Sequence, residues 1–202
     1  MAQYVFTDIH GCYKEFMVIL NKIELQQNDQ LIFLGDYIDR GPDSFKVVEK
    51  VIELQNNYDT ITLLGNHEDM MLSNYRLWIV NGGNATIRSY EKELNTEFYL
   101  PTTHESFFKG LELFYETEDY IFVHAGYNKH FLIKEYIIWI RAEFYLQKPR
   151  SDGKTVIFGH TPFRRPFQEE GRIGIDTGCC YGGYLTCMKI NNNSITFITS
   201  KD

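Results

Sequence analysis

The stretch Leu31-Ile-Phe-Leu-Gly-Asp-Tyr-Ile-Asp-Arg-Gly-Pro-Asp43 decides how the rest of the chain is interpreted. Its apolar run, Leu31 to Leu34, predicts a short buried strand that stops at Gly35. Four charged residues follow this strand: Asp36, Asp39, Arg40 and Asp43. Proteins of the α/β class build their sites where buried strands end. The stretch therefore predicts an α/β fold with a site at this point. Asp36 is a candidate bridge between two metal ions, because a carboxylate has two oxygens.

Strands and helices alternate through the N-terminal part of the chain. Apolar runs predict strands at residues 3–7, 31–35 and 60–64. Apolar residues at helical spacing predict helices over 13–25, after the capping pair Asp43-Ser44, and around Met70 to Trp78. Regular alternation of this kind predicts a parallel sheet with helices on its faces.

The C-terminal part is richer in strands. Segments 111–116 and 120–124 predict a hairpin, and residues 135–144 predict one helix. Further strands are expected at 155–158, 173–175, 184–190 and 194–199. No linker or repeat interrupts the chain, so we expect a single domain over residues 1–202, built from two packed sheets with flanking helices.

Composition narrows the class of protein. The 202 residues are 44% hydrophobic and 23% charged, which is typical of globular proteins. A formal net charge of −7 argues against a non-specific nucleic-acid binder, and no apolar run has the length of a membrane helix. The segment MAQYVFTDIH is interpreted as a strand that leads into a motif, not as a signal peptide. The four cysteines form no CxxC pair, so we expect reduced thiols and a cytoplasmic location.

Metal-ligating residue types recur where the predicted strands end. They are Asp8 and His10, Asp36, Asn66 and His67, His124, and His160. Any one of them would ordinarily be a helix cap or a structural hydrogen-bonding group. Their recurrence at five strand ends favours a shared site, in which Asp8 and His10 point the same way if their segment is extended. Oxygen and imidazole donors without thiolates suit two hydrolytic metal ions, with manganese first and iron or zinc as alternatives.

Five blocks carry a resemblance to a known family: TDIHG (7–11), GDYIDRG (35–41), GNHE (65–68), HAG (124–126) and GHTP (159–162). Together they resemble the PPP family of metal-dependent phosphoesterases, and within it the compact bacterial and phage-type serine/threonine protein phosphatases. Thr7 stands where that family usually has glycine. The resemblance implies a calcineurin-like metallophosphoesterase fold, in which a two-sheet β-sandwich is flanked by helices in four α/β/β/α layers.

The resemblance also implies a role for each matching residue. Asp8 and His10 would bind the first metal ion and Asp36 would bridge both, with the second completed by Asn66, His124 and His160. His67 would be the general acid, oriented by Asp39. Arg40 and Arg141 would grip the phosphate oxygens, for which a planar guanidinium is suited. A hydroxide bridging the two metal ions would attack phosphorus directly, so no nucleophilic side chain is needed.

The expected function is therefore a metal-dependent phosphomonoester hydrolase acting as a serine/threonine protein phosphatase, with a phosphorylated protein or peptide as its partner. The alternative on the same fold is a symmetrical bis(5'-nucleosyl)-tetraphosphate hydrolase, or an enzyme for another small phosphoester. Those tetraphosphate hydrolases tend to carry Gln at the position of His10 and GNHD in place of GNHE, which favours the phosphatase. A non-catalytic binding module is disfavoured because every expected ligand is present. No regulatory subunit, nucleic acid or membrane is implied as a partner.

Several other residues have simpler expected roles. Glu68 is expected to begin a helix or support a ligand. His104 and His130 match no block and are expected at the surface. Cys12 is expected to pack at the edge of the site, and the adjacent Cys179 and Cys180 are expected on a loop near the metal ions.

Overall fold

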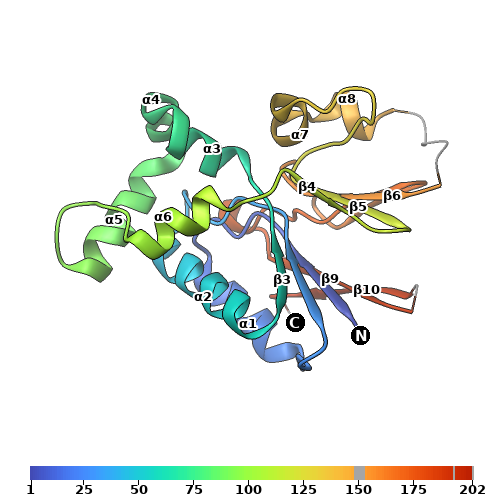
Figure 1. The fold of residues 1–202 in the computed structure, drawn as a ribbon, viewed down its shortest axis with the longest axis horizontal. Helices are drawn as coiled ribbons and strands as arrows, with labels where there is room; N and C mark the ends of the chain where they lie inside the picture. Colours follow the sequence, from blue (N-terminus) through green and yellow to red (C-terminus); the bar gives the residue numbers. More distant parts are fainter. Residues whose placement is uncertain (148–152, 193, 202) are drawn as a thin grey trace.

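The fold was established from a computed structural model, which describes residues 1–147, 153–192 and 194–201. Within these residues it contains two five-stranded sheets. The first has the order β10 (Ser194–Thr199), β9 (Thr186–Asn191), β1 (Gln3–Phe6), β2 (Gln30–Phe33) and β3 (Asp59–Thr62). The second has the order β4 (Phe114–Glu116), β5 (Tyr120–Val123), β6 (Thr155–Phe158), β8 (Arg172–Gly174) and β7 (Phe167–Glu169). Figure 1 shows the two sheets facing each other.

Helices cover the outer face of each sheet (Figure 1). Helices α1 (Tyr13–Lys22) and α2 (Ser44–Asn57) pack on the first sheet, and α7 (Lys134–Trp139) and α8 (Ala142–Tyr145) pack on the second. The remaining helical segments are α3 (Asn66–Ser73), α4 (Tyr75–Trp78), the π-helical turn η1 (Ile79–Gly83), α5 (Asn84–Leu94), α6 (Thr102–Lys109) and the 3₁₀ turn η2 (Cys179–Tyr181). The predicted four-layer α/β/β/α architecture is confirmed.

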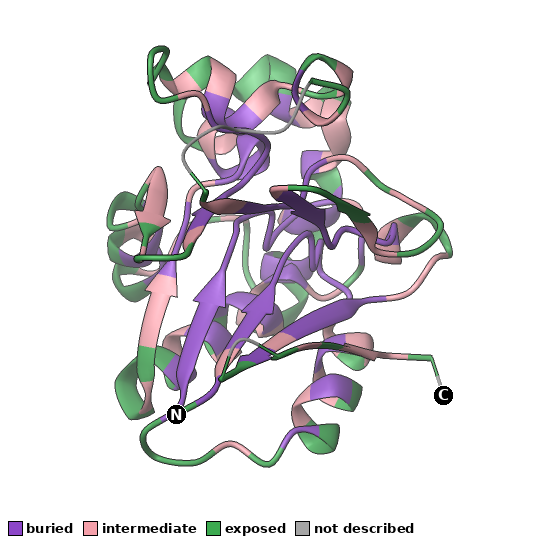
Figure 2. Cartoon of the chain, turned by 90° about the vertical axis from the view of Figure 1, so that its right-hand side faces the viewer, coloured by how far each residue is buried: buried purple, intermediate pink, exposed green. Residues whose placement is uncertain are grey.

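Three apolar layers hold these four layers together. Along β1, Tyr4 and Phe6 face α1 and α2, whereas Val5 between them faces the second sheet. On β6, Ile157 faces the first sheet and its neighbours Val156 and Phe158 face α7 and α8. Alternate residues of a strand point to opposite faces, so a strand buried on both faces is apolar throughout. Figure 2 shows the central strands buried and the helices exposing their outer sides.

The strand directions place the ends of both sheets together. Strands β1, β2 and β3 are parallel, as are β5, β6 and β8. Parallel strands bring their carboxyl ends to one edge of a sheet. The two edges meet where the His160 N–H donates to the Asp8 carboxylate at 2.8 Å, across 152 positions of sequence. The alternation in the sequence thus positions one site between two sheets.

The structure corrects three expectations about elements. The helix expected over 135–144 is two short helices, because the backbone is extended at Ile140 and leaves the helical region at Arg141. The first helix ends at Lys22, short of residue 25. Strand β7 was not expected, and it pairs antiparallel with β8 at the edge of the second sheet. Among the described residues, no helix combines the length and apolar composition needed to span a membrane.

Candidate active site

The residues singled out from the strand ends lie together in the structure. Asp8 and His10 follow β1, and Asp36 follows β2. Asn66 and His67 begin α3 directly after β3. His124 follows β5 and His160 follows β6. All seven side chains are buried. The site therefore draws on five strand ends of two sheets.

The backbone at this site is strained. Of the eight non-glycine residues with positive φ in the described part of the chain, six belong to the expected site: Asp8, His10, Asp36, Asp39, Arg40 and His160. A positive φ costs free energy for residues with a Cβ, and such strain gathers at functional sites. The sequence predicts an extended segment for Asp8 and His10, and this is wrong: both residues have left-handed backbone, with φ 47° and 46°. His10 Nε2 lies 3.9 Å from Asp8 Oδ1 and 3.3 Å from Asp36 Oδ2.

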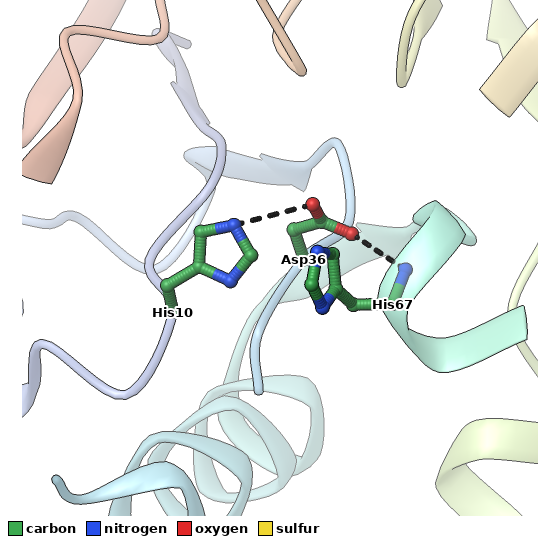
Figure 3. A group of neighbouring side chains, drawn as sticks. All are labelled: His10, Asp36 and His67. Carbon is green, nitrogen blue, oxygen red and sulfur yellow. Dashed lines mark hydrogen bonds and ion pairs between the residues drawn. The ribbon is translucent and has the colours of Figure 1, made fainter. Parts of the chain in front are cut away.

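Asp36 lies between His10 and His67 (Figure 3). Its Oδ1 accepts a hydrogen bond from the His67 backbone N–H at 3.0 Å. Its buried Oδ2 has no hydrogen-bond donor, and lies 3.3 Å from His10 Nε2 and 3.6 Å from His124 Nε2. The bridge expected from the sequence has two carboxylate oxygens to draw on, and in the structure Oδ1 accepts a backbone hydrogen bond. Oδ2 alone faces both groups of ligands.

The first group of ligand atoms contains Asp36, His10 and Asp8. The His10 Nδ1–H donates to the Ile38 carbonyl at 2.7 Å, and Nε2 lies 3.3 Å from Asp36 Oδ2. Asp8 uses Oδ2 for the Thr7 hydroxyl and the His160 N–H, and its Oδ1 lies 3.9 Å from His10 Nε2. Hydrogen bonds of this kind on the far side of a ligand orient it toward a metal ion.

The second group contains Asp36, Asn66, His124 and His160. The His124 Nδ1–H donates to the Leu34 carbonyl at 2.9 Å, and the His160 Nε2–H donates to the Trp139 carbonyl at 3.2 Å. The other ring nitrogens of these two histidines lie together, with His124 Nε2 3.2 Å from His160 Nδ1 and 3.0 Å from Asn66 Oδ1. Acceptors do not attract one another without a cation or a proton between them.

These observations fit two bound metal ions. The ligand atoms of Asp36, His124 and His160 lie within 4.8 Å of one another, as do those of His10, Asp36 and His67. Asp36 belongs to both groups. The donors are carboxylate, amide and imidazole, which suit manganese, iron or zinc in a hydrolytic site. A buried carboxylate oxygen without a donor is costly, and a cation removes that cost.

His67 and Asp39 form a hydrogen-bonded pair beside the first group. The His67 Nδ1–H donates to Asp39 Oδ2 at 2.6 Å. The other Asp39 oxygen accepts hydrogen bonds from Trp78 Nε1 at 2.9 Å and the Thr86 hydroxyl at 2.6 Å. Asp39 is thereby fixed in place, and it leaves the buried Nε2 of His67 without a partner. Nδ1 is thus occupied by Asp39, and Nε2 is the ring nitrogen without a partner.

Two arginines contact residues of the site, Arg40 at His10 and Arg141 at His160. Arg40 is half-buried, donates to His10 Nε2 at 2.5 Å and lies with its guanidinium carbon 5.2 Å from the centre of the Tyr181 ring. Arg141 is exposed and donates to the His160 carbonyl at 2.8 Å. The break between α7 and α8 falls at Arg141. Both guanidinium groups are thus available to an anion at the metal ligands.

Glu68 binds the loop that carries Asp36, in addition to its expected place at the start of a helix. Its carboxylate accepts hydrogen bonds from the backbone N–H groups of Asp36 and Tyr37, both at 2.9 Å, and of Gly65 at 3.2 Å. The motif GNHE predicts that Glu68 lies at the start of a helix, and Glu68 does lie in the first turn of α3. The structure shows that it also joins the β2–α2 loop to α3.

Burial and neighbouring charges shift several pKa values in the site. Burial, with the Asp36 charge nearby, raises the pKa of Glu68 to about 8. Burial and the adjacent His124 lower the pKa of His160 to about 2, which keeps its Nδ1 a free ligand atom. Burial also lowers the pKa of His67. Burial acts to raise the pKa of Asp36, but the surrounding histidines outweigh this and hold that pKa well below its usual range. The site therefore attracts positive charge to Asp36.

The structure separates the two histidines outside the motifs. His130 is exposed, as expected. His104 is fully buried, so the expectation of a surface position is wrong. Its Nδ1 accepts from the Tyr90 hydroxyl at 2.8 Å, and its Nε2–H donates to Glu49 at 2.5 Å. These partners belong to α5 and α2, and no motif in the sequence indicates that α6 packs against them.

Comparison with known proteins agrees with this geometry. A family model described as calcineurin-like phosphoesterase matches residues 1–198. A serine/threonine-protein phosphatase 1 of Salmonella typhimurium is 30% identical over 93% of this chain and 91% of its own length. The asymmetrical bis(5'-nucleosyl)-tetraphosphatase PrpE of Anoxybacillus flavithermus is 26% identical over 94% and 90%. A cold-active protein-tyrosine phosphatase of a Shewanella species has a similar fold, with a TM-score of 0.71, 15% identity, and 99% and 80% coverage.

Proposed function

The chain belongs to the calcineurin-like phosphoesterase family, and from that premise we propose that it is a two-metal phosphomonoesterase that removes phosphate from serine and threonine residues of proteins. The observation that carries the proposal is the Oδ2 atom of Asp36. It is buried and without a donor, and it faces ligand atoms of two groups at 3.3 and 3.6 Å. One oxygen shared in this way suits a pair of cations.

In this proposal, the first ion is held by Asp8, His10 and Asp36, and the second by Asp36, Asn66, His124 and His160. Two cations bound there supply Lewis-acid chemistry, by neutralising phosphate charge and lowering the pKa of water toward neutrality. Manganese is the first choice and iron or zinc the alternatives, because the two proposed ligand sets contain oxygen and nitrogen but no thiolate.

The protein's own residues bind the phosphate and handle the proton. Arg40 and Arg141 offer planar donors to the phosphate oxygens from two sides. His67 delivers a proton from Nε2 to the leaving serine or threonine oxygen, while Nδ1 stays bonded to Asp39 at 2.6 Å. The Asp39 carboxylate favours the protonated imidazole that this step requires. Trp78 and Thr86 hold that carboxylate in place.

The choice of substrate rests on the motif residues. His10 and the sequence GNHE favour a phosphoprotein, and the relative at 30% identity is named a serine/threonine phosphatase. The second candidate is a dinucleoside tetraphosphate hydrolase, which the name of the relative at 26% identity favours. That relative is named an asymmetrical tetraphosphatase, whereas the alternative expected from the sequence is a symmetrical tetraphosphate hydrolase. We further propose a cytoplasmic protein that acts without a regulatory subunit, a nucleic acid or a membrane.

The test is a direct comparison of substrates. Metal-stripped protein is supplied with Mn²⁺ and given either a phosphoserine/phosphothreonine peptide or diadenosine tetraphosphate. The expected result is a higher kcat/KM on the peptide. Preference for the dinucleotide would replace the proposal by the second candidate.

A matched variant shows whether the activity belongs to this site. Asp36→Asn is expected to lose activity on both substrates, because its neutral amide no longer binds two cations. Asp43→Asn, a half-buried residue later in the same loop that pairs with surface lysines, is expected to retain it. Turnover that survives in Asp36→Asn would come from a contaminant or another site and would overturn the proposal.

A further inference from the structure

Two cysteines far apart in the sequence lie close together beside the proposed metal site. They are Cys12, which follows β1, and Cys179, which begins η2. Their sulfurs and a carboxylate oxygen of Glu15 lie within 4.8 Å of one another. Both thiols are free. Neither residue has a role in the phosphoester hydrolysis proposed above, so that reaction does not explain why the two thiols lie together.

The two thiols differ in their access to solvent. Cys12 is buried, with 8% of its surface exposed, and Cys179 is half-buried in the 3₁₀ turn η2. A small oxidant can therefore reach Cys179 first, with Cys12 directly behind it. An accessible thiol next to a second one is the arrangement found at redox-sensitive sites.

Both cysteines belong to loops that shape the proposed active site. Cys12 follows His10-Gly11, and the Gly11 backbone is packed so tightly that an added Cβ would lie 2.8 Å from the Gly41 carbonyl. Cys179 lies on a turn bounded by Gly178 and Gly182, both with positive φ. The same turn carries Tyr181, whose ring contacts Arg40.

We propose that Cys12 and Cys179 are an oxidisable dithiol that forms an intramolecular disulfide on exposure to a hydroperoxide, and that this disulfide switches off the hydrolytic site. The formation of the disulfide is independent of the proposed function. The loss of turnover rests on that function.

The chemistry balances with the hydroperoxide as the oxidant. The Cys179 sulfur attacks the nearer peroxide oxygen, so that an S–O bond forms and the O–O bond breaks. The leaving oxygen takes the thiol proton and departs as an alcohol, or as water from hydrogen peroxide. The Cys12 sulfur then attacks the Cys179 sulfenic acid, the S–S bond forms, and the hydroxyl leaves with the Cys12 proton as water. Two thiols are oxidised by two electrons in total and one peroxide is reduced.

The two sulfurs lie within 4.8 Å of each other, and bond formation requires a closer approach, since a disulfide bond is about 2 Å long. The tightly packed Gly11 segment has little room to move, whereas η2 is bounded by two glycines. We therefore expect η2 to shift, which moves Tyr181 away from Arg40. Reduction by a dithiol restores both thiols and the original contact.

The experiment uses the Mn²⁺-loaded full chain, treated with hydrogen peroxide and then alkylated and digested without reductant. The expected product is one pair of peptides joined through Cys12 and Cys179, with two of the four thiols lost. Turnover of a phosphoester is expected to fall at least tenfold and to return with dithiothreitol. Cys12→Ser and Cys179→Ser are expected to lack the joined peptides and to keep their turnover after brief exposure. Cys187→Ser, a buried cysteine on β9, is the matched control and should behave as wild type.

Three results would overturn the proposal. One is a disulfide between the adjacent Cys179 and Cys180. Another is equal loss of turnover in Cys12→Ser and wild type, which would place the sensitive group elsewhere. The third is a metal ion bound by Cys12, Glu15 and Cys179 that shields both thiols from peroxide. Peptide mapping reports on the disulfide whether or not the chain hydrolyses a phosphoester, so failure of the proposed function is distinguishable from failure of this inference.

Discussion

The Nε2 atom of His67 can serve either of two functions. It is buried without a partner, and a ring nitrogen of His67 lies within 4.8 Å of ligand atoms of both His10 and Asp36. By distance alone it could join the first metal ion. Its Nδ1 bond to Asp39 instead favours a proton donor, because a carboxylate at 2.6 Å stabilises the protonated ring.

Replacing His67 by Asn distinguishes these functions. If His67 is the general acid, the Asn variant should have a kcat on a phosphoserine peptide that is lower by roughly 10²- to 10⁴-fold. The loss should be much smaller on an aryl phosphate, whose leaving group needs no proton, and the metal content should stay the same. His130→Asn, at an exposed histidine, is the control for the substitution itself. A variant that binds one metal ion fewer would make His67 a ligand.

Glu68 acts on Asp36 through the backbone. Glu68→Gln keeps one oxygen but turns an NH₂ group toward backbone N–H groups that lie 2.9 to 3.2 Å from the carboxylate. Leaving such a donor unpaired costs about 1–3 kcal/mol. We expect urea unfolding to show that loss, with weaker Mn²⁺ binding in the folded variant. Glu53→Gln, at an exposed position on α2, should change stability by less than about 0.5 kcal/mol. Equal stability of the two variants would remove Glu68 from this role.

At the scale of elements, a single buried histidine joins three helices. His104 on α6 accepts from Tyr90 on α5 and donates to Glu49 on α2. The Tyr90 side chain is fully buried. These hydrogen bonds are satisfied by a neutral imidazole, with one nitrogen as acceptor and the other as donor. The junction supports α2, the helix that follows the Asp36 loop.

This junction predicts a dependence of stability on pH. Burial lowers the pKa of His104 below its usual 6.5 in the folded chain. The unfolded chain then binds more protons in acid, so the contribution of His104 is present above about pH 6.5 and is lost as pH falls. Between about pH 7.5 and about pH 5.5, we expect wild type to lose more free energy of unfolding than His104→Phe does. His130→Phe should lose as much as wild type. The same pH slope in His104→Phe and wild type would contradict the assignment.

The bounds of helices and strands were predicted correctly where the local sequence pattern determines them. They were wrong where contacts between distant segments determine them. The strand at 155–158 was predicted with its correct bounds, because an apolar run between polar residues is a local signal. The break in the 135–144 helix has no such signal. It coincides with two hydrogen bonds to a distant residue: His160 Nε2–H donates to the Trp139 carbonyl, and the Arg141 side chain donates to the His160 carbonyl.

At the scale of the whole molecule, the sheet architecture and the gathering of ligand residues were predictable. Parallel strands bring their ends to one edge whatever the details of packing. The sequence pattern does not predict which loops approach each other. Three features depend on distances between segments remote in sequence: the proximity of Cys12 and Cys179, the burial of His104, and the hydrogen bond from a backbone N–H to Asp36 Oδ1.

The most direct test of the account is metal binding by the stripped protein. Mn²⁺ is added stepwise, and bound ions are counted while the electron paramagnetic resonance spectrum is recorded. We predict two ions per chain with an exchange-coupled spectrum, because one oxygen of Asp36 faces both groups of ligands. Asp36→Asn should lose the coupled signal. Binding of a single ion, or of two ions whose spectra remain independent, would contradict a centre shared through Asp36.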